Sequence, residues 1–356
     1  MLLSLLMLGV GGWGVLALTY WDRANPTLRA TLAAAYGIVS LALIVLFWMP
    51  HSRWRAFGVF AALFVLLLAC WSGIKPSNDR DWVPEDAVLA YASIDGDRIT
   101  LHNIRNFDYR TEKDYTPAYY DRTFDLRQLN EVDLFASYWM GPTIAHVFLS
   151  FGFADGNHVA ISIEARYERG QGYSTVQGFF RQFPLYYVVA DERDIVRLRT
   201  NYRKDPPEQV YLYRLHGPAE NGRRLFLEYV ERLNSLKEHP EWYNTLTTNC
   251  TSVIWLNSRI NPQHLPYSWK ILLSGHVPEF LYEHGKLDSD VPFDELQRRA
   301  HINALAQAAD QAADFSQRIR AREPPDTAAA GSSAKQGLVE DRAGADRGPD
   351  RDPSRP

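Results

Sequence analysis

Cys250 stands where a thiol could act as a nucleophile. It follows the polar stretch "NTLTTN" and precedes the apolar, helix-compatible run "TSVIW". Thr247, Thr248 and Asn249 are all acceptable N-caps, so the sequence predicts a helix that begins at Cys250. A thiol attacks only as its thiolate, and both a helix N-terminus and a nearby imidazole lower the thiol pKa. Thiol chemistry at Cys250 would therefore require a histidine brought close to it by the fold.

The clearest hairpin in the sequence carries a histidine and a glutamate that could complete such a site. The runs "HVFLSFGF" and "HVAISIEA" alternate on either side of "ADGN", as expected for two antiparallel strands joined by a turn. Side chains alternate across a strand, so Glu164 shares one face with His158 and Ser162. A turn centred at residues 155–156 places residue 146 opposite residue 164. We therefore predict that His146 and Glu164 lie side by side, where the carboxylate would fix the imidazole tautomer.

Each of these residues also has an ordinary structural explanation. A lone cysteine is more often packing than a nucleophile, and a strand histidine is usually only hydrogen-bonded. His158 is an alternative third member because it shares a face with Glu164. Asn249 could orient His146 or simply cap the helix. The combination of an unpaired cysteine, a capped helix and a His–Glu pair on one hairpin face favours catalysis.

Three apolar runs precede this region and predict membrane-spanning helices. They cover residues 1–18, 31–49 and 57–71. A span requires roughly 17–25 predominantly apolar residues, which the third run reaches with its flanks. A signal peptide is the alternative for the first run. That run lacks a basic start, however, and is followed by further apolar runs rather than by a polar domain.

The loops between the apolar runs set the predicted orientation. The tight loop at residues 50–55 carries Arg53 and Arg55, whereas the arginines in the loop at residues 20–30 are diluted by Asp22. The positive-inside rule then favours the tight loop in the cytoplasm, with everything after the third run outside.

The net charge and the number of cysteines limit what the chain is expected to bind and how Cys250 is used. The chain has 356 residues and a net charge of −4, which gives no reason to expect nucleic acid as a partner. Of its two cysteines, Cys70 falls in the third apolar run and is most simply a packing residue. Oxidising compartments favour paired cysteines. The unpaired Cys250 of an extracytoplasmic domain is therefore either buried and inert or retained for chemistry.

The remaining sequence predicts a mixed α+β domain. Strands are expected on either side of "DGD" (95–97) and in "FPLYYVVA" and "PEQVYLYRL", while the aromatic segment before residue 146 shows no regular pattern. Apolar residues at helical spacing between Leu225 and Leu236 predict a helix that Pro240 ends. The predicted domains are a membrane domain (1–72), a linker (73–82), the α+β domain (83–290), a helical extension (291–322) and a disordered tail (323–356).

Several motifs resemble the Lnb-type N-terminal periplasmic domain, a family named for a bacterial lipoprotein N-acyltransferase. They are "IKPSNDRDW", "NIRNFDYR", "AHVFLSFGF", "SIEARYERG", "DERD", "LRTNYR" and "YNTLTTNCTS". The likeness covers about residues 74–275. That domain is in turn similar to permuted papain-like proteins of the NlpC and lecithin:retinol acyltransferase groups. These use a strand histidine, a polar residue on the next strand and a later cysteine that opens a helix. The resemblance thus implies His146, Glu164 and Cys250 as the catalytic residues of an antiparallel papain-like sheet behind three membrane helices.

The resemblance also implies a reaction. Cys250 would take an acyl chain from a membrane phospholipid as a thioester and pass it to an amine, such as a lipoprotein N-terminus. It implies no metal and no cofactor, and it places the protein in the bacterial inner membrane with a periplasmic catalytic domain. The supporting residues would be Asn249, Ser162, Arg166 and His158.

Several alternatives remain open. Arg166 and the "DERD" residues 191–194 could bind substrate or form structural ion pairs. A papain-like fold also hosts amidases and peptidases that act on cell-wall peptides. In a non-catalytic envelope module, Cys250 would merely be buried.

Overall fold

The computed structural model describes residues 1–21 and 25–321. The predicted disordered tail (323–356) and Asp22 of the first loop lie outside these residues. The described N-terminal part contains three helices: α1 (Leu2–Thr19), α2 (Pro26–Phe47) and α3 (Arg53–Ser72). By length and composition, each of them could cross a membrane, in agreement with the three predicted spans.

A mostly antiparallel sheet forms the centre of the domain that follows α3. Within the described ranges it has nine strands in the order β1-β2-β9-β8-β7-β6-β10, with β5 beside β2 and β11 beside β9. Only β2 and β9 pair in parallel, through Arg105 and Ala190. The strands are β1 (Tyr91–Asp95), β2 (Arg98–Arg105), β5 (Tyr119–Asp125), β6 (Leu129–Tyr138), β7 (Ala145–Phe153), β8 (His158–Ala165), β9 (Pro184–Ala190), β10 (Gln209–Arg214) and β11 (Glu241–Trp242). Two short strands, β3 (Asp108–Tyr109) and β4 (Tyr115–Thr116), form a separate pair.

The sequence pattern located most of the longer strands but missed β5 and β6. The predicted hairpin is β7–β8, and the strands around "DGD" are β1 and β2. The segment before residue 146, which shows no regular pattern, contains β5 and β6. The last six residues of β6 are all buried. A strand covered on both faces does not alternate between polar and apolar residues, so its sequence gives no period-two signal.

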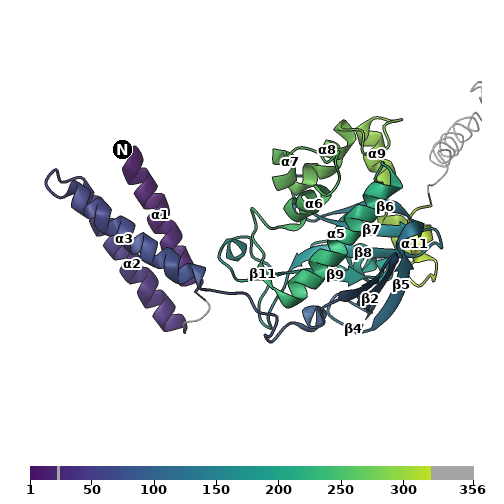
Figure 1. The fold of residues 1–356 in the computed structure, drawn as a ribbon, viewed down its shortest axis with the longest axis horizontal. Coiled ribbons are helices and arrows are strands. Elements are labelled where there is room, and N and C mark those ends of the chain that lie inside the picture. Colours follow the sequence, from purple (N-terminus) through teal and green to yellow (C-terminus); the bar gives the residue numbers. More distant parts are fainter. Residues whose placement is uncertain (22–24, 322–356) are drawn as a thin grey trace, which may run out of the picture. The chain divides into compact units, whose positions relative to one another are not determined.

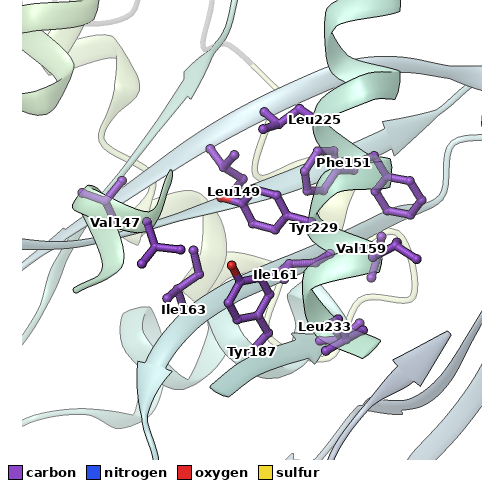
Figure 2. Packing of buried hydrophobic residues seen from close by; sticks show 14 of the residues in the cluster. Val147, Leu149, Phe151, Val159, Ile161, Ile163, Tyr187, Leu225, Tyr229 and Leu233 are labelled. Atoms are coloured by element: carbon purple, nitrogen blue, oxygen red, sulfur yellow. The ribbon is translucent and has the colours of Figure 1, made fainter. Parts of the chain in front are cut away.

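One face of the sheet is covered by α5 (Ala219–Glu238), which lies across the strands in Figure 1. Figure 2 shows Leu225, Tyr229 and Leu233 of this helix over Leu149 and Ile161 of the sheet. The buried residues of α5 are those predicted from helical spacing: Leu225, Phe226, Tyr229, Val230, Leu233 and Leu236. The helix ends at Glu238, just before Pro240, as expected.

The other face of the sheet carries a second apolar cluster. Helices α4 (Glu192–Arg197), α10 (Asn303–Ala308) and α11 (Phe315–Arg318) contribute to it together with Phe135 and Phe148 of the sheet. The segment expected as a helical extension, which also contains α9 (Phe293–Ala300), thus packs onto the domain. The remaining helices are α6 (Cys250–Ser258), α7 (Trp269–Leu272) and α8 (Val277–Glu283).

Candidate active site

The two strands of the central hairpin separate beside the start of α6. Strands β7 and β8 pair from Gly152 with His158 to Leu149 with Ile161, and there their pairing stops. Each strand nevertheless continues, β7 along β6 and β8 along β9. Helix α6 contacts both β7 and β8. The separated ends of the strands therefore leave room for the nucleophile-bearing end of α6.

Helix α6 begins at Cys250, as the sequence predicted, and Asn249 caps it. The Asn249 side-chain oxygen accepts the Ser252 N–H at 2.8 Å, and the Ser252 hydroxyl accepts the Asn249 N–H at 2.9 Å. The Asn249 amide nitrogen donates to the Thr245 carbonyl at 2.7 Å. Both ends of the Asn249 amide are thus engaged in fixing the start of the helix, so Asn249 acts as a cap.

His146, Ser162 and Glu164 form a continuous hydrogen-bonded chain. The Ser162 hydroxyl donates to Glu164 Oε1 at 2.7 Å, and its oxygen lies 2.7 Å from His146 Nε2. His146 Nε2 is also 3.5 Å from Glu164 Oε1. The register of the paired part of the hairpin, continued past its end, sets residue 146 opposite residue 164, as predicted. The structure adds that Ser162 lies between the two charged groups.

This chain determines which imidazole nitrogen can serve the thiol. Because Ser162 gives its only proton to Glu164, it must accept one from His146 Nε2. Nδ1 is then the nitrogen available to Cys250, whose thiol is hydrogen-bonded to His146. The backbone N–H groups of Val147 and Thr251 also donate to the Cys250 sulfur. Cys250 as a residue is half-buried.

The surroundings favour the thiolate–imidazolium pair. Burial opposes a charged ring, but hydrogen bonds to Cys250 and Glu164 outweigh it and raise the pKa of His146 to about 9. For Cys250, burial alone would raise the thiol pKa. The hydrogen bond and the charge of His146, together with the two backbone N–H groups, outweigh burial and lower this pKa. The pKa of Glu164 also lies well below its usual range, because His146 and Arg199 outweigh the effect of burial. The surroundings therefore favour a negative sulfur, a positive ring and a negative carboxylate in sequence.

Sequence reasoning missed a buried arginine behind Glu164. Arg199 donates to Glu164 Oε1 at 3.2 Å, and its Nε lies 3.7 Å from Glu208 Oε2. Glu208 in turn binds Arg203 and the Ser137 hydroxyl. Arg199 and Arg203 belong to the motif "LRTNYR", for which the sequence predicted no role. The sequence did contain a signal for this network. Two arginines close to a buried strand must be paired with carboxylates, because an unpaired buried charge is costly.

His158 lies away from the thiol, which argues against its assignment as a supporting residue, and Arg166 is engaged by backbone carbonyls. His158 opens β8 and approaches Glu131 at 3.4 Å, at the far end of the strand from Glu164. Six residues of strand separate the two positions by about 20 Å. Arg166 is buried and donates to the backbone carbonyls of Asp86 and Ala87. Sharing a strand face with Glu164 therefore did not place His158 at the site, while Arg166 binds the backbone of residues 86–87.

The "DERD" residues form internal contacts, which is the structural alternative of the two left open. Asp191 caps α4 by accepting the Arg193 N–H at 2.9 Å. Glu192 accepts the Ser150 hydroxyl, and Asp194 pairs with Arg105 at 2.9 Å. Glu192 and Asp194 are fully buried. These side chains hold α4 against the sheet.

One group of side chains in the described part of the chain has the composition of a metal site. Glu131, Asp133 and His158 bring their ligand atoms within 4.8 Å of one another. The Arg214 guanidinium, however, lies 2.7 Å from Glu131 and 2.5 Å from Asp133. The arginine already supplies the cation that these carboxylates require, and the group is remote from Cys250.

Comparison with known proteins identifies the central part of the chain. Residues 115–275 match the family model described as the Lnb N-terminal periplasmic domain. This range includes His146, Glu164 and Cys250. Together with the three apolar helices, the match fits a membrane-anchored protein with a periplasmic domain. Neither the search of curated proteins nor the search of solved structures found a match.

Proposed function

We propose that this protein is a cysteine acyltransferase of the bacterial cell envelope. It would move an acyl chain from a phospholipid to Cys250 and then to an amine, such as the N-terminus of a lipoprotein. The observation that carries the proposal is the Cys250–His146–Ser162–Glu164 chain at the start of a capped helix. We also propose that this sheet and α6 form a permuted papain-like fold. The three helices would lie in the inner membrane and the domain in the periplasm.

In the first half of the reaction, the Cys250 thiolate attacks the ester carbonyl carbon. A C–S bond forms and the carbonyl oxygen becomes an oxyanion, which the backbone N–H of Cys250 at the start of α6 can stabilise. Collapse of this intermediate breaks the C–O bond. The departing lysophospholipid alkoxide takes the proton from His146 Nδ1, and the acyl chain remains on sulfur as a thioester.

In the second half, an amine attacks the thioester carbonyl. His146, now neutral, accepts a proton from the amine as the C–N bond forms. The C–S bond breaks and the sulfur leaves as the thiolate, which the renewed imidazolium stabilises. Glu164, acting through Ser162, keeps the imidazole in the tautomer that both halves require.

The same residues could hydrolyse an amide, so the amidase reading is the second candidate. Amidase action on cell-wall peptides would suit a polar, open cleft. The cavity beside α6 is instead lined mainly by apolar side chains, among them Leu149, Ile254 and Phe280. This lining suits an acyl chain better than a charged peptide.

The decisive experiment measures the acyl adduct. The full-length protein, purified in detergent, is incubated with phospholipid carrying isotope-labelled acyl chains and analysed by intact mass. We expect one labelled acyl group on Cys250, and we expect none in Cys250→Ala or His146→Ala. Cys70→Ala and His158→Ala are matched controls, because Cys70 lies in α3 and His158 contacts Glu131.

The outcomes separate the candidates. An adduct that the controls keep and the two site variants lose would establish the thioester step, and added amine should then discharge it. If the protein stays unmodified by lipid but releases fragments from cell-wall peptides, the amidase assignment replaces ours. Absence of both activities would leave Cys250 as a packing residue.

A further inference from the structure

An apolar cavity runs beside α6, the helix that begins with Cys250. Its volume is about 200 Å³. Its walls come from β6, β7, α5, α6 and α8, and they include Leu134, Leu149, Leu225, Ile254 and Phe280. Figure 2 shows Leu149 and Leu225 close together in the core from which this wall is built.

The inner end of the cavity lies against the nucleophile. Val147 and Thr251 both line the cavity, and the backbone N–H of each donates to the Cys250 sulfur. Ile254 also lines it, one helical turn after Cys250. The Cys250 sulfur is therefore hydrogen-bonded to two residues of the cavity wall.

The outer end of the cavity is polar and open to solvent. Ser258 lines the cavity at the end of α6, seven residues and about 10 Å beyond Thr251. Exposed residues form the rim, namely Asn130, His216, Gly217, Ala219, Gln263 and His264. The space is thus elongated along α6, with a reactive group at its buried end and water at the other.

We propose that this cavity binds the acyl chain of the donor, with the carbonyl at Cys250 and the tail running along α6 toward Ser258. The inference rests on the proposed acyl transfer and adds where the chain lies. An acyl chain has one polar end, which must reach the sulfur, and a linear apolar tail, which gains by leaving water. The reactive end, the apolar walls and the elongated form of the cavity meet these requirements together.

The volume sets how much of the chain is held. An apolar cavity of about 150 Å³ binds benzene, so by proportion this one accommodates about eight carbon atoms. Longer chains must extend past the rim at Ala219 and His216. Burial of each methylene improves binding about fourfold, so selectivity should rise with chain length and then level off near octanoyl.

The test uses p-nitrophenyl esters of butyrate, hexanoate, octanoate and decanoate with the full-length protein in detergent. The second-order rate constant for acylation of Cys250 is followed by nitrophenolate release and checked by intact mass. We expect it to rise about fourfold per methylene up to octanoyl and little beyond. In Ser258→Trp, which narrows the outer end of the cavity, the octanoyl-to-butyryl ratio should fall about sixteenfold through the loss of about two buried methylenes.

Two further variants make the result interpretable. Leu256→Trp places the same side chain on α6 at an exposed position outside the cavity, and it should keep the wild-type ratio. Ala219→Trp fills the exposed rim, where a large side chain carries little risk to folding, and it should lower the decanoyl-to-butyryl ratio. This variant replaces Ser258→Trp in the test if the latter does not fold.

The inference fails if acylation occurs at Cys250 but the ratios are the same in wild type, Ser258→Trp and Ala219→Trp. It also fails if the wild-type rate is independent of chain length. Failure of the proposed function would look different, because phospholipid would then leave Cys250 unmodified whether or not the p-nitrophenyl esters acylate it.

Discussion

The thiol of Cys250 and the imidazole of His146 each favour the charged form of the other, and this coupling makes a measurable prediction. The pKa of Cys250 is lowered by His146, while that of His146 is raised to about 9. The site is a thiolate–imidazolium pair above the lowered pKa of Cys250 and below the raised pKa of His146. Alkylation of Cys250 by iodoacetamide should therefore be fast at neutral pH, with a midpoint below the ordinary thiol pKa of about 8.5.

Removal of the imidazole should reverse this shift. In His146→Ala the effect of burial is no longer opposed by the ring, so the alkylation midpoint should move up to about 8.5 or higher. The rate of acyl transfer, unlike that of alkylation, also depends on the proton that His146 gives to the leaving group. This rate should fall again above about pH 9, where the ring loses that proton. An alkylation midpoint that is identical in wild type and His146→Ala would contradict the coupling.

Ser162 makes a separate prediction, because it is the hydrogen-bonding link between His146 and Glu164. Ser162→Ala should slow acylation about ten- to hundredfold, as expected from the loss of a hydrogen bond to a charged group worth about 1.5–3 kcal/mol. The serine acts through the ring, so the alkylation midpoint of Cys250 should also rise as the pair weakens. Ser162→Thr keeps the hydroxyl and should restore most of the rate. A slower rate with no shift in the midpoint would mean that Ser162 only packs.

At the scale of elements, the π-helical turn at Leu198–Tyr202 places Arg199 between the carboxylates of Glu164 and Glu208. Glu164 and Glu208 both lie against this guanidinium, whose side chain is 4% exposed. In Arg199→Met both carboxylates would lose the buried guanidinium that they share, although Glu164 keeps His146 and Glu208 keeps Arg203. We expect a loss of about 3–5 kcal/mol in the free energy of unfolding, seen as a fall of about 10 °C or more in the melting temperature.

An exposed ion pair provides the matched control for Arg199. Arg110 pairs with Asp114 in a turn, and both side chains are more than half exposed. Arg110→Met should cost no more than about 1 kcal/mol. Equal effects of the two substitutions would show that Arg199 does not carry the buried network.

The same elements show what could be predicted from sequence and why. The hairpin face, the helix start at Cys250 and the buried stripe of α5 follow from local periods and caps, and all were predicted correctly. The contribution of Arg199 was not, because it depends on a contact between β8 and a turn 35 residues later. Likewise, the face shared by Glu164 and His158 was correct, but six residues of extended chain keep His158 away from the thiol.

At the scale of the whole molecule, Arg166 links the domain to the chain that leaves the membrane helices. It donates to Asn78 and to the carbonyls of Asp86 and Ala87, and its guanidinium lies 4.0 Å from the Trp82 ring. The linker is therefore bound to the domain from Asn78 onward. The five residues 73–77 form a short tether between Ser72 and Asn78, which at full extension spans about 20 Å. A domain held this close to the end of α3 suits a substrate that lies in the bilayer.

The orientation of the helices decides on which side of the membrane the tether holds the domain. This orientation can be tested by cysteine labelling. His51 in the loop between α2 and α3 and Asp79 after α3 are both exposed. Each is replaced by cysteine in a chain that also carries Cys70→Ser and Cys250→Ser. In spheroplasts treated with a membrane-impermeant maleimide, we expect labelling of Asp79→Cys but not of His51→Cys, because Arg53 and Arg55 favour a cytoplasmic loop. Membrane lysis should expose both positions. The reverse pattern would place the thiol in the cytoplasm, where a reducing environment accounts for an unpaired Cys250 without any catalytic role.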